Sequence, residues 1–163
     1  MSKSTLLIDN VVFAKSREQL EGQLTLEQCP RLAELTNAEA DTKDTIHYDL
    51  QGELDNLGRP HLNLLIQAKL TVTCQRCLEP MTLNLNRQYH YLITDVESDD
   101  PEDNDDVDFQ EPSLAMDAVQ LIEDEIIMAL PIAPTHEQNC GPQVTQSGEK
   151  PNPFAVLKGL IKP

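Results

Sequence analysis

Apolar and polar residues alternate along the middle of the chain, as they do in β-strands that bury one face. One alternating run spans residues 46–54, a second spans 62–74 and a third spans 81–93. Residues 55–60 have the turn-forming sequence Asp-Asn-Leu-Gly-Arg-Pro, so the first two runs predict a β-hairpin. The third run extends this hairpin to an antiparallel sheet whose apolar face needs a cover.

A helical pattern later in the chain predicts this cover. Apolar residues recur at intervals of three and four from Leu114 to Leu130. Ser113 is a candidate N-cap and Pro131 ends the pattern. The sequence therefore predicts one long helix on the sheet.

The two ends of the chain carry weaker signals. Apolar residues at positions 6–8 and 11–13 predict a first strand. A capping box that begins at Thr25 predicts a short helix to about residue 35, and residues 152–160 predict a short C-terminal helix. The predicted fold class is α+β: an antiparallel β-sheet, curved or barrel-like, covered by one long helix, with short N- and C-terminal helices and an acidic loop.

The length of 163 residues fits one domain. We assign residues 1–140 to a single α+β domain, and residues 141–163 to a flexible linker and the short C-terminal helix. The formal net charge is −16, and ten acidic residues but no basic ones lie between Asp95 and Glu111. This composition predicts an acidic flexible loop over about residues 95–112.

Charge and composition exclude several classes of protein. Such an acidic chain is a poor general binder of nucleic-acid backbones and of anionic membranes. No apolar stretch reaches the roughly 18 residues of a membrane span, and no secretion signal is visible. Four cysteines are too few for a disulfide scaffold, which favours the cytoplasm. A local RNA contact stays open, because residues 59–94 are mildly basic.

Four residues have the spacing of a zinc site. Cys74 and Cys77 form a C-x2-C pair at a predicted strand end, and His136 and Cys140 form an H-x3-C pair after the long helix. Together they supply the three thiolates and one imidazole of a closed tetrahedral Zn²⁺ site. The alternative is that the cysteines are ordinary reduced thiols and that His136 lies on a surface loop. Cys29 follows a helical apolar pattern and is interpreted as a packing residue.

Catalytic patterns are weak in this sequence. A C-x2-C pair can act as a redox dithiol, but a strand pattern follows it here instead of the helix that thioredoxins have. No phosphate-binding loop, dinucleotide fingerprint or nucleophile elbow is present. The adjacent acids of residues 123–125 diverge on a helix and cannot converge on one substrate. We therefore expect a protein that is not an enzyme.

Three segments resemble a known family. Residues 74–80 (Cys-Gln-Arg-Cys-Leu-Glu-Pro) are similar to the C-x-R-C-x-x-P segment of the bacterial YceD family, the large ribosomal RNA subunit accumulation proteins. Residues 123–131 resemble the family's E-D-E run that ends in Leu-Pro, and residues 150–157 resemble its N-P-F-A segment. His136 and Cys140 lie where family members carry His or Cys.

The resemblance implies a role in ribosome biogenesis, in the synthesis, processing or stability of 23S ribosomal RNA. An acidic body favours a basic ribosomal or assembly protein as the partner over extended contact with RNA. We predict that Arg76, Asn152, Pro153 and Phe154 contact this partner. Residues 154–157 can instead pack onto the sheet. The alternative functions are a structural zinc-binding adaptor and a metal-dependent RNA-processing enzyme; the sequence indicates no oligomeric state.

Overall fold

The computed structural model describes residues 5–36, 44–95, 107–138 and 140–141. Its elements are, in chain order, β1 (Leu7–Ile8), α1 (Asn10–Lys15), β2 (Gln19–Leu24), the 3-10 turn η1 (Leu26–Gln28), α2 (Pro30–Leu35), β3 (Thr45–Leu54), β4 (Pro60–Thr73), β5 (Pro80–Ile93), β6 (Asp108–Gln110), β7 (Met116–Asp117) and α3 (Ala118–Ala129).

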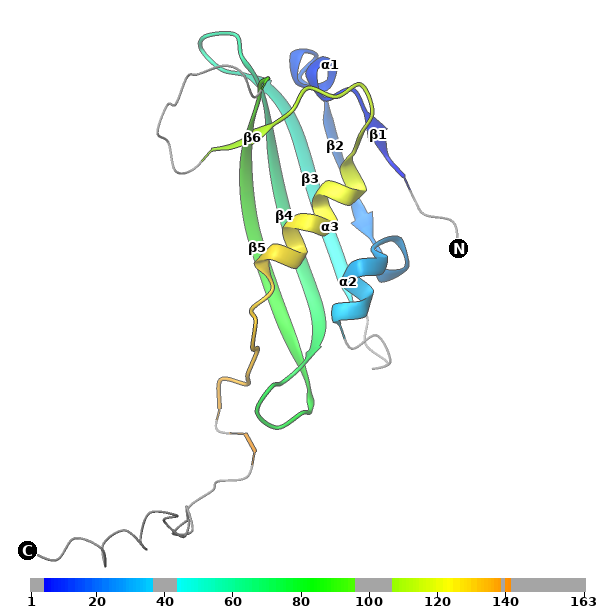
Figure 1. Ribbon diagram of the computed structural model, residues 1–163, viewed down its shortest axis with the longest axis vertical. Coiled ribbons are helices and arrows are strands. Elements are labelled where there is room, and N and C mark those ends of the chain that lie inside the picture. Colours follow the sequence, from blue (N-terminus) through cyan, green and yellow to red (C-terminus); the bar gives the residue numbers. More distant parts are fainter. Residues whose placement is uncertain (1–4, 37–43, 96–106, 139, 142–163) are drawn as a thin grey trace, which may run out of the picture.

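One sheet of five strands dominates the fold, in the order β2-β3-β4-β5-β6 (Figure 1). The first four strands are antiparallel neighbours, and β6 pairs in parallel with β5 over Tyr91–Ile93. The long strands β4 and β5 form a hairpin that extends well beyond α3 (Figure 1). A separate two-stranded sheet joins β1 to β7 and so ties the N-terminal segment to the start of α3.

The core lies between one face of the sheet and the helices. Leu50, Leu64 and Ile66 point inward from β3 and β4, where they are fully or almost fully buried. Ile122 and Ile126 of α3 pack in the same cluster. In Figure 1, α3 crosses this face of the sheet and α2 lies beside it. Apolar and polar residues thus alternate in the central strands because only one face of the sheet is buried.

Helix α1 sits so close to β3 that only glycine fits beneath it. A Cβ atom at Gly52 would lie 2.5 Å from the carbonyl oxygen of Phe13 and 2.7 Å from the Cα atom of Ala14. Both contacts are with backbone, which cannot rotate away. Gly52 therefore fixes how closely α1 approaches the sheet.

The predicted fold class needs correction in three respects. The predicted long helix over residues 114–130 is wrong, since α3 has 12 residues and begins only after β7. The predicted barrel-like closure is wrong, because the sheet is open and its end strands β2 and β6 do not pair. The sheet is also not wholly antiparallel, because β6 runs parallel to β5.

The elements near the N-terminus also differ from the prediction. Residues 6–13 do not form one strand: β1 takes only Leu7–Ile8, and Asp9 then caps α1 by accepting a hydrogen bond from the backbone N–H of Val12 at 2.9 Å. The predicted helix from Thr25 divides into η1 and α2, with Pro30 as the first residue of α2, where its missing N–H is not needed. The hairpin of β3 and β4 is confirmed.

Two predicted features fall largely on residues that the structure does not describe. The C-terminal helix lies within residues 142–163, and most of the acidic loop lies within residues 96–106. Strand β6 occupies Asp108–Gln110, near the end of the predicted loop. Within the described ranges, no helix has the length and apolar character needed to cross a membrane.

Candidate metal centre

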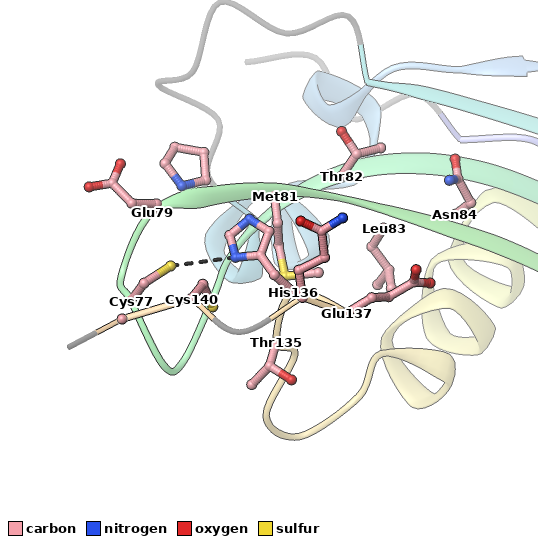
Figure 2. Close-up of a pocket in the computed structure, with 13 residues that line it drawn as sticks. Cys77, Glu79, Met81, Thr82, Leu83, Asn84, Thr135, His136, Glu137 and Cys140 are labelled. Atoms are coloured by element: carbon pink, nitrogen blue, oxygen red, sulfur yellow. Dashed lines mark hydrogen bonds between the residues drawn. The ribbon is translucent and has the colours of Figure 1, made fainter. Parts of the chain in front are cut away.

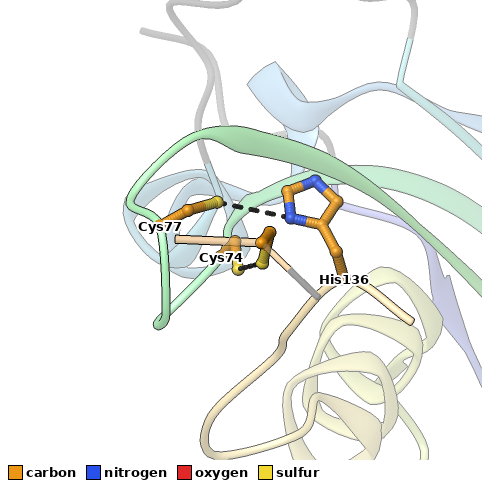
Figure 3. A group of neighbouring side chains, drawn as sticks. Cys74, Cys77 and His136 are labelled. Atoms are coloured by element: carbon orange, nitrogen blue, oxygen red, sulfur yellow. Dashed lines mark hydrogen bonds between the residues drawn. The ribbon is translucent and has the colours of Figure 1, made fainter. Parts of the chain in front are cut away.

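The turn between β4 and β5 brings two cysteines to the segment that follows α3. Cys74 and Cys77 come from this turn, and His136 comes from the chain beyond α3 (Figure 3). Cys140 follows His136 in the same segment. One ligand atom from each of the four lies within 4.8 Å of the others. Residues far apart in the sequence thus form one compact group, as their spacing predicts.

Backbone hydrogen bonds shape the turn that holds the first pair. The Cys74 N–H donates to the carbonyl of Glu79, and the Leu78 N–H donates to the carbonyl of Cys74, both at 2.9 Å. Leu78 adopts a left-handed φ of 64°, a conformation usually left to glycine. This tight turn brings the sulfur atoms of Cys74 and Cys77 within 4.8 Å of each other.

Contacts from the turn also fix the second pair. The Gln75 N–H donates to the carbonyl of Pro134 at 2.8 Å. The Arg76 guanidinium group donates to the carbonyls of His136 and Gln138 at 3.4 and 3.5 Å. Gly141 has a φ of 97°, and a Cβ there would lie 3.2 Å from the Arg76 carbonyl oxygen. The two segments therefore pack through backbone atoms as well as through the four side chains.

Two of the distances between ligand atoms are close to the edges of a tetrahedral zinc site. The sulfur atoms of Cys74 and Cys140 are 3.5 Å apart, and the sulfur of Cys77 is 3.4 Å from Nδ1 of His136. Zinc bonds of about 2.3 Å to sulfur and 2.0 Å to nitrogen give tetrahedral edges of about 3.8 Å between two sulfur atoms and about 3.5 Å between sulfur and nitrogen. The sulfur–sulfur distance is much longer than the roughly 2.05 Å of a disulfide, and these cysteines are free.

The surroundings of Cys74 lower the pKa of its thiol. Burial alone would raise its pKa, but hydrogen bonds from the backbone of Cys77, Arg76 and His136 lower the pKa to about 5. The pKa of the neighbouring Cys140 is raised by burial and by its hydrogen bonds to the other two thiols. The pair thus combines a thiolate with a thiol, and a bound cation would favour loss of the second proton.

The chemistry of this group is that of a structural site. Three thiolates and one imidazole suit zinc, and four protein ligands leave no position for a water molecule or a substrate. Cys29 stands apart from the group, since it is fully buried among the core residues next to α2. Burial raises the pKa of Cys29 to about 12, as expected for a packing residue.

The other residues singled out in the sequence have different surroundings. Arg76 supports the ligand-bearing segment through the bonds described above, and its contact with a partner stays a prediction. Asn152, Pro153 and Phe154 lie outside the described residues. Among the basic residues of the middle region, Arg59 pairs with Asp55 at 2.7 Å in the turn at the opposite end of β4 from Arg76.

The buried acids of α3 have structural partners. Glu125 accepts a hydrogen bond from the Tyr91 hydroxyl at 2.7 Å. Glu123 accepts bonds from α2, including one of 2.8 Å from the backbone N–H of Arg31. The two carboxylates thus serve the packing of the helix on its neighbours.

Sequence reasoning missed a groove beside the metal-ligating group. It has a volume of about 1000 Å³ and opens between the start of β5 and the segment after α3 (Figure 2). Its lining residues are Cys77, Glu79, Pro80, Met81, Thr82, Leu83, Asn84, Thr135, His136, Glu137, Gln138, Cys140 and Gly141. The one sequence signal for it is the uncharged run at the start of the third alternating segment.

Comparisons with known proteins bear on the whole chain. The sequence profile of the family described as "Large ribosomal RNA subunit accumulation protein YceD" matches residues 62–161, a range that includes all four candidate ligands. The chain is also 31% identical over 174 aligned residues to the Large ribosomal RNA subunit accumulation protein YceD of Haemophilus influenzae. That alignment covers 97% of this chain and 96% of the relative. No solved structure matches significantly.

Proposed function

The chain belongs to the YceD family of large ribosomal RNA subunit accumulation proteins, and we propose on this basis that it acts in the accumulation of 23S ribosomal RNA. The observation that carries the proposal is the similarity to the Haemophilus relative along nearly the full length of both chains. A match of that extent includes the sheet, α3 and the metal-ligating group together.

The factor acts by binding and not by catalysis. The carboxylates of α3 that an RNA-processing enzyme would need are engaged in packing, Glu125 with Tyr91 and Glu123 with α2. The four candidate metal ligands form a closed set without a position for substrate. These features support a role in which the protein holds another component of the assembling subunit.

The partner is a basic ribosomal or assembly protein. The net charge of −16 attracts basic proteins and repels RNA backbone. The basic side chains of the middle region are dispersed, since Arg59 and Arg76 lie at opposite ends of β4. This arrangement leaves room for a local RNA contact but supports protein binding as the main interaction.

Zinc is the metal that the group of Cys74, Cys77, His136 and Cys140 holds in this proposal. It supplies four bonds that join the β4–β5 turn to the segment after α3. The residues around it position the ligands: Arg76 and Gln75 hold the second segment by hydrogen bonds to its carbonyls. The role of the metal is structural.

The experiment that tests the proposal is gene deletion followed by complementation. We expect the ratio of 23S to 16S ribosomal RNA to fall in the deletion strain and to recover when the wild-type gene is restored. A Cys74→Ser variant should recover the ratio incompletely. An unchanged ratio in the deletion strain would refute the proposed role.

Affinity capture identifies the class of partner. The tagged full chain should retain a basic protein at low salt after nuclease treatment, and should release it at high salt. If RNA is retained and all protein is lost on nuclease treatment, the preference for a protein partner is wrong.

A further inference from the structure

Among the described residues, one edge of strand β5 has no paired strand along most of its length, and we call it the free edge of β5. Its other edge pairs with β4 over thirteen residue pairs from Thr73↔Pro80 to His61↔Leu92, whereas β6 covers only Tyr91–Ile93. In the part of the chain that the structure describes, no strand pairs with this edge between Pro80 and His90. Those residues span about 36 Å at 3.3 Å per residue and present unpaired backbone groups.

The strand itself lacks the sequence features that usually protect an edge against pairing. Natural sheets protect such edges with charged side chains, prolines or bulges. Between Met81 and His90, the sequence contains no proline and only one charged residue, Arg87. The register with β4 is continuous, without a bulge. A long, regular and nearly uncharged edge is suited to take up an added strand.

The groove beside the metal-ligating group gives access to this edge. Five consecutive residues, Pro80 to Asn84, line it. Since successive side chains of a strand point to opposite faces, a cavity lined by all five lies along the strand's edge. Figure 2 shows Thr82 and Asn84 on one side of the strand, and Met81 and Leu83 on the other. The volume of about 1000 Å³ leaves space for an extended segment.

The charge of the groove selects its occupant. Glu79 and Glu137 are its acidic lining residues, and its lining contains neither lysine nor arginine. Met81 and Leu83 are half-buried and offer an apolar contact at every second position. An occupant that complements both features is extended and basic, with apolar side chains at alternate positions.

We infer that the free edge of β5 binds an extended basic segment of a partner protein as an added strand, beginning in the groove between Glu79 and Glu137. Backbone hydrogen bonds to Met81–Gln88 supply the binding, and the two glutamates select for positive charge. The class of partner rests on the proposed function, and the inference adds the surface on which that partner binds.

The test uses the full chain and a synthetic decapeptide of alternating lysine and valine. Binding is measured by fluorescence anisotropy, and amide hydrogen exchange is followed over residues 81–90. We expect the peptide to slow exchange in this segment and nowhere on β2 or β3. A decapeptide of alternating glutamate and valine, and a lysine–valine peptide N-methylated at alternate residues, should bind at least about tenfold more weakly.

A pair of charge reversals provides the matched test in the protein. Glu79→Lys combined with Glu137→Lys should weaken binding of the lysine–valine peptide about tenfold at low salt. Glu21→Lys combined with Glu53→Lys makes the same change in net charge on exposed positions of β2 and β3. These control substitutions should leave the affinity nearly unchanged, because they lie away from the groove.

Three outcomes would overturn the inference. One is unchanged exchange over residues 81–90 at saturating peptide. Another is an equal loss of affinity in both pairs of charge reversals, which would indicate attraction by net charge alone. The third is protection of residues 81–90 in the free chain that disappears in a Phe154→Asp, Leu157→Asp variant, which would make the chain's own C-terminal segment the occupant. None of these depends on the 23S ratio, so failure here is distinguishable from failure of the proposed function.

Discussion

Glu123 on α3 caps the N-terminus of helix α2 by accepting hydrogen bonds from Arg31 and Leu32. One carboxylate oxygen of Glu123 accepts the backbone N–H of Arg31 at 2.8 Å, and the other accepts the guanidinium group of the same residue at 2.8 Å. The first oxygen also accepts the N–H of Leu32 at 3.1 Å. Cys29, the N-cap residue, makes no capping bond with its own side chain. A side chain distant in the sequence thus supplies the cap that the local sequence lacks.

This cap predicts a marked loss of stability in Glu123→Ala. The substitution leaves the N–H groups of Arg31 and Leu32 without their acceptor in a part-buried region, so we expect a loss of about 3 kcal/mol. Asp124→Ala is the control, because Asp124 contacts the same arginine at 2.6 Å but is 40% exposed. Its loss should stay under about 1 kcal/mol. Chemical denaturation measures both, and equal losses would contradict the capping role.

Metal binding should depend on Cys74 and not on Cys29. We expect elemental analysis to find one zinc ion per wild-type chain, and none or a minor fraction in Cys74→Ser, with a lower melting temperature. Cys29→Ala should retain zinc, since Cys29 is buried in the core apart from the ligands. Absence of zinc from wild-type protein purified without chelators would contradict the assignment.

Acid should release the metal over a defined range of pH. Burial opposes ionisation of Cys74, but backbone hydrogen bonds hold its pKa at about 5. Protons compete with the metal for the thiolate, so binding should persist at pH 7 and be lost as the pH falls toward and below about 5. A colorimetric zinc indicator in a titration from pH 7.5 to 4 follows the release. Full retention at pH 4 would contradict this prediction.

The left-handed backbone conformation of Leu78 leads us to expect that Leu78→Gly stabilises the protein. Leu78 has a φ of 64° and a side chain that is largely exposed, so Leu78→Gly relieves strain and loses little contact. We expect a gain of about 0.5–1 kcal/mol in the free energy of unfolding. Gly58 is the converse control: its φ is 78° in open space, and Gly58→Ala should cost about 1 kcal/mol. A loss of stability in Leu78→Gly would show that the side chain has a packing role.

Glu125 should make stability depend on pH. Burial raises the pKa of Glu125 above its usual value of 4.5, against the hydrogen bond from Tyr91 and together with the charge of Asp108. Because the folded state binds this proton more tightly, the contribution of Glu125 is most favourable below pH 4.5 and is lost as the pH rises through the folded value. Glu125→Gln should therefore be more stable than wild type at pH 7.5.

This difference should shrink as the pH approaches 4, where both side chains are neutral. Thermal unfolding at a series of pH values measures it. A variant that is less stable than wild type at pH 7.5 would show that the ionised carboxylate is preferred in the folded state.

The sequence predicts the elements that depend on one buried face. The alternation through β3, β4 and β5 indicates the central strands, because each contacts the core on a single side. The segment over residues 6–13 does not allow such a prediction, because short apolar runs fit a strand or a helix equally well. In the structure, Asp9 caps the N-terminus of α1, and the second half of the segment is helical. Ser113 resembles an N-cap, but pairing of β7 with β1 delays the helix to Asp117.

The sequence likewise predicts one part of the candidate site and not another. The grouping of the four candidate ligands is predictable, because the spacing within each pair is typical of metal sites. The groove and the free edge of β5 are not, because they depend on where β6 pairs and where the chain passes after α3. The cap from Glu123 to Arg31 is also invisible in sequence, since it joins residues 92 positions apart.

In the proposed zinc site, the spacing of the two ligand pairs determines when during synthesis of the chain the metal can bind. Cys77 and His136 are 59 positions apart, and Cys74 and Cys140 are 66 apart. At about 5–20 residues per second, a translating ribosome makes the second pair roughly 3–12 s after the first. For that interval the β4–β5 turn has two thiols and no partners, and α3 is made before the site can close. In the proposed zinc-bound state, the metal can therefore join the site only after every described strand and α3 have been synthesised.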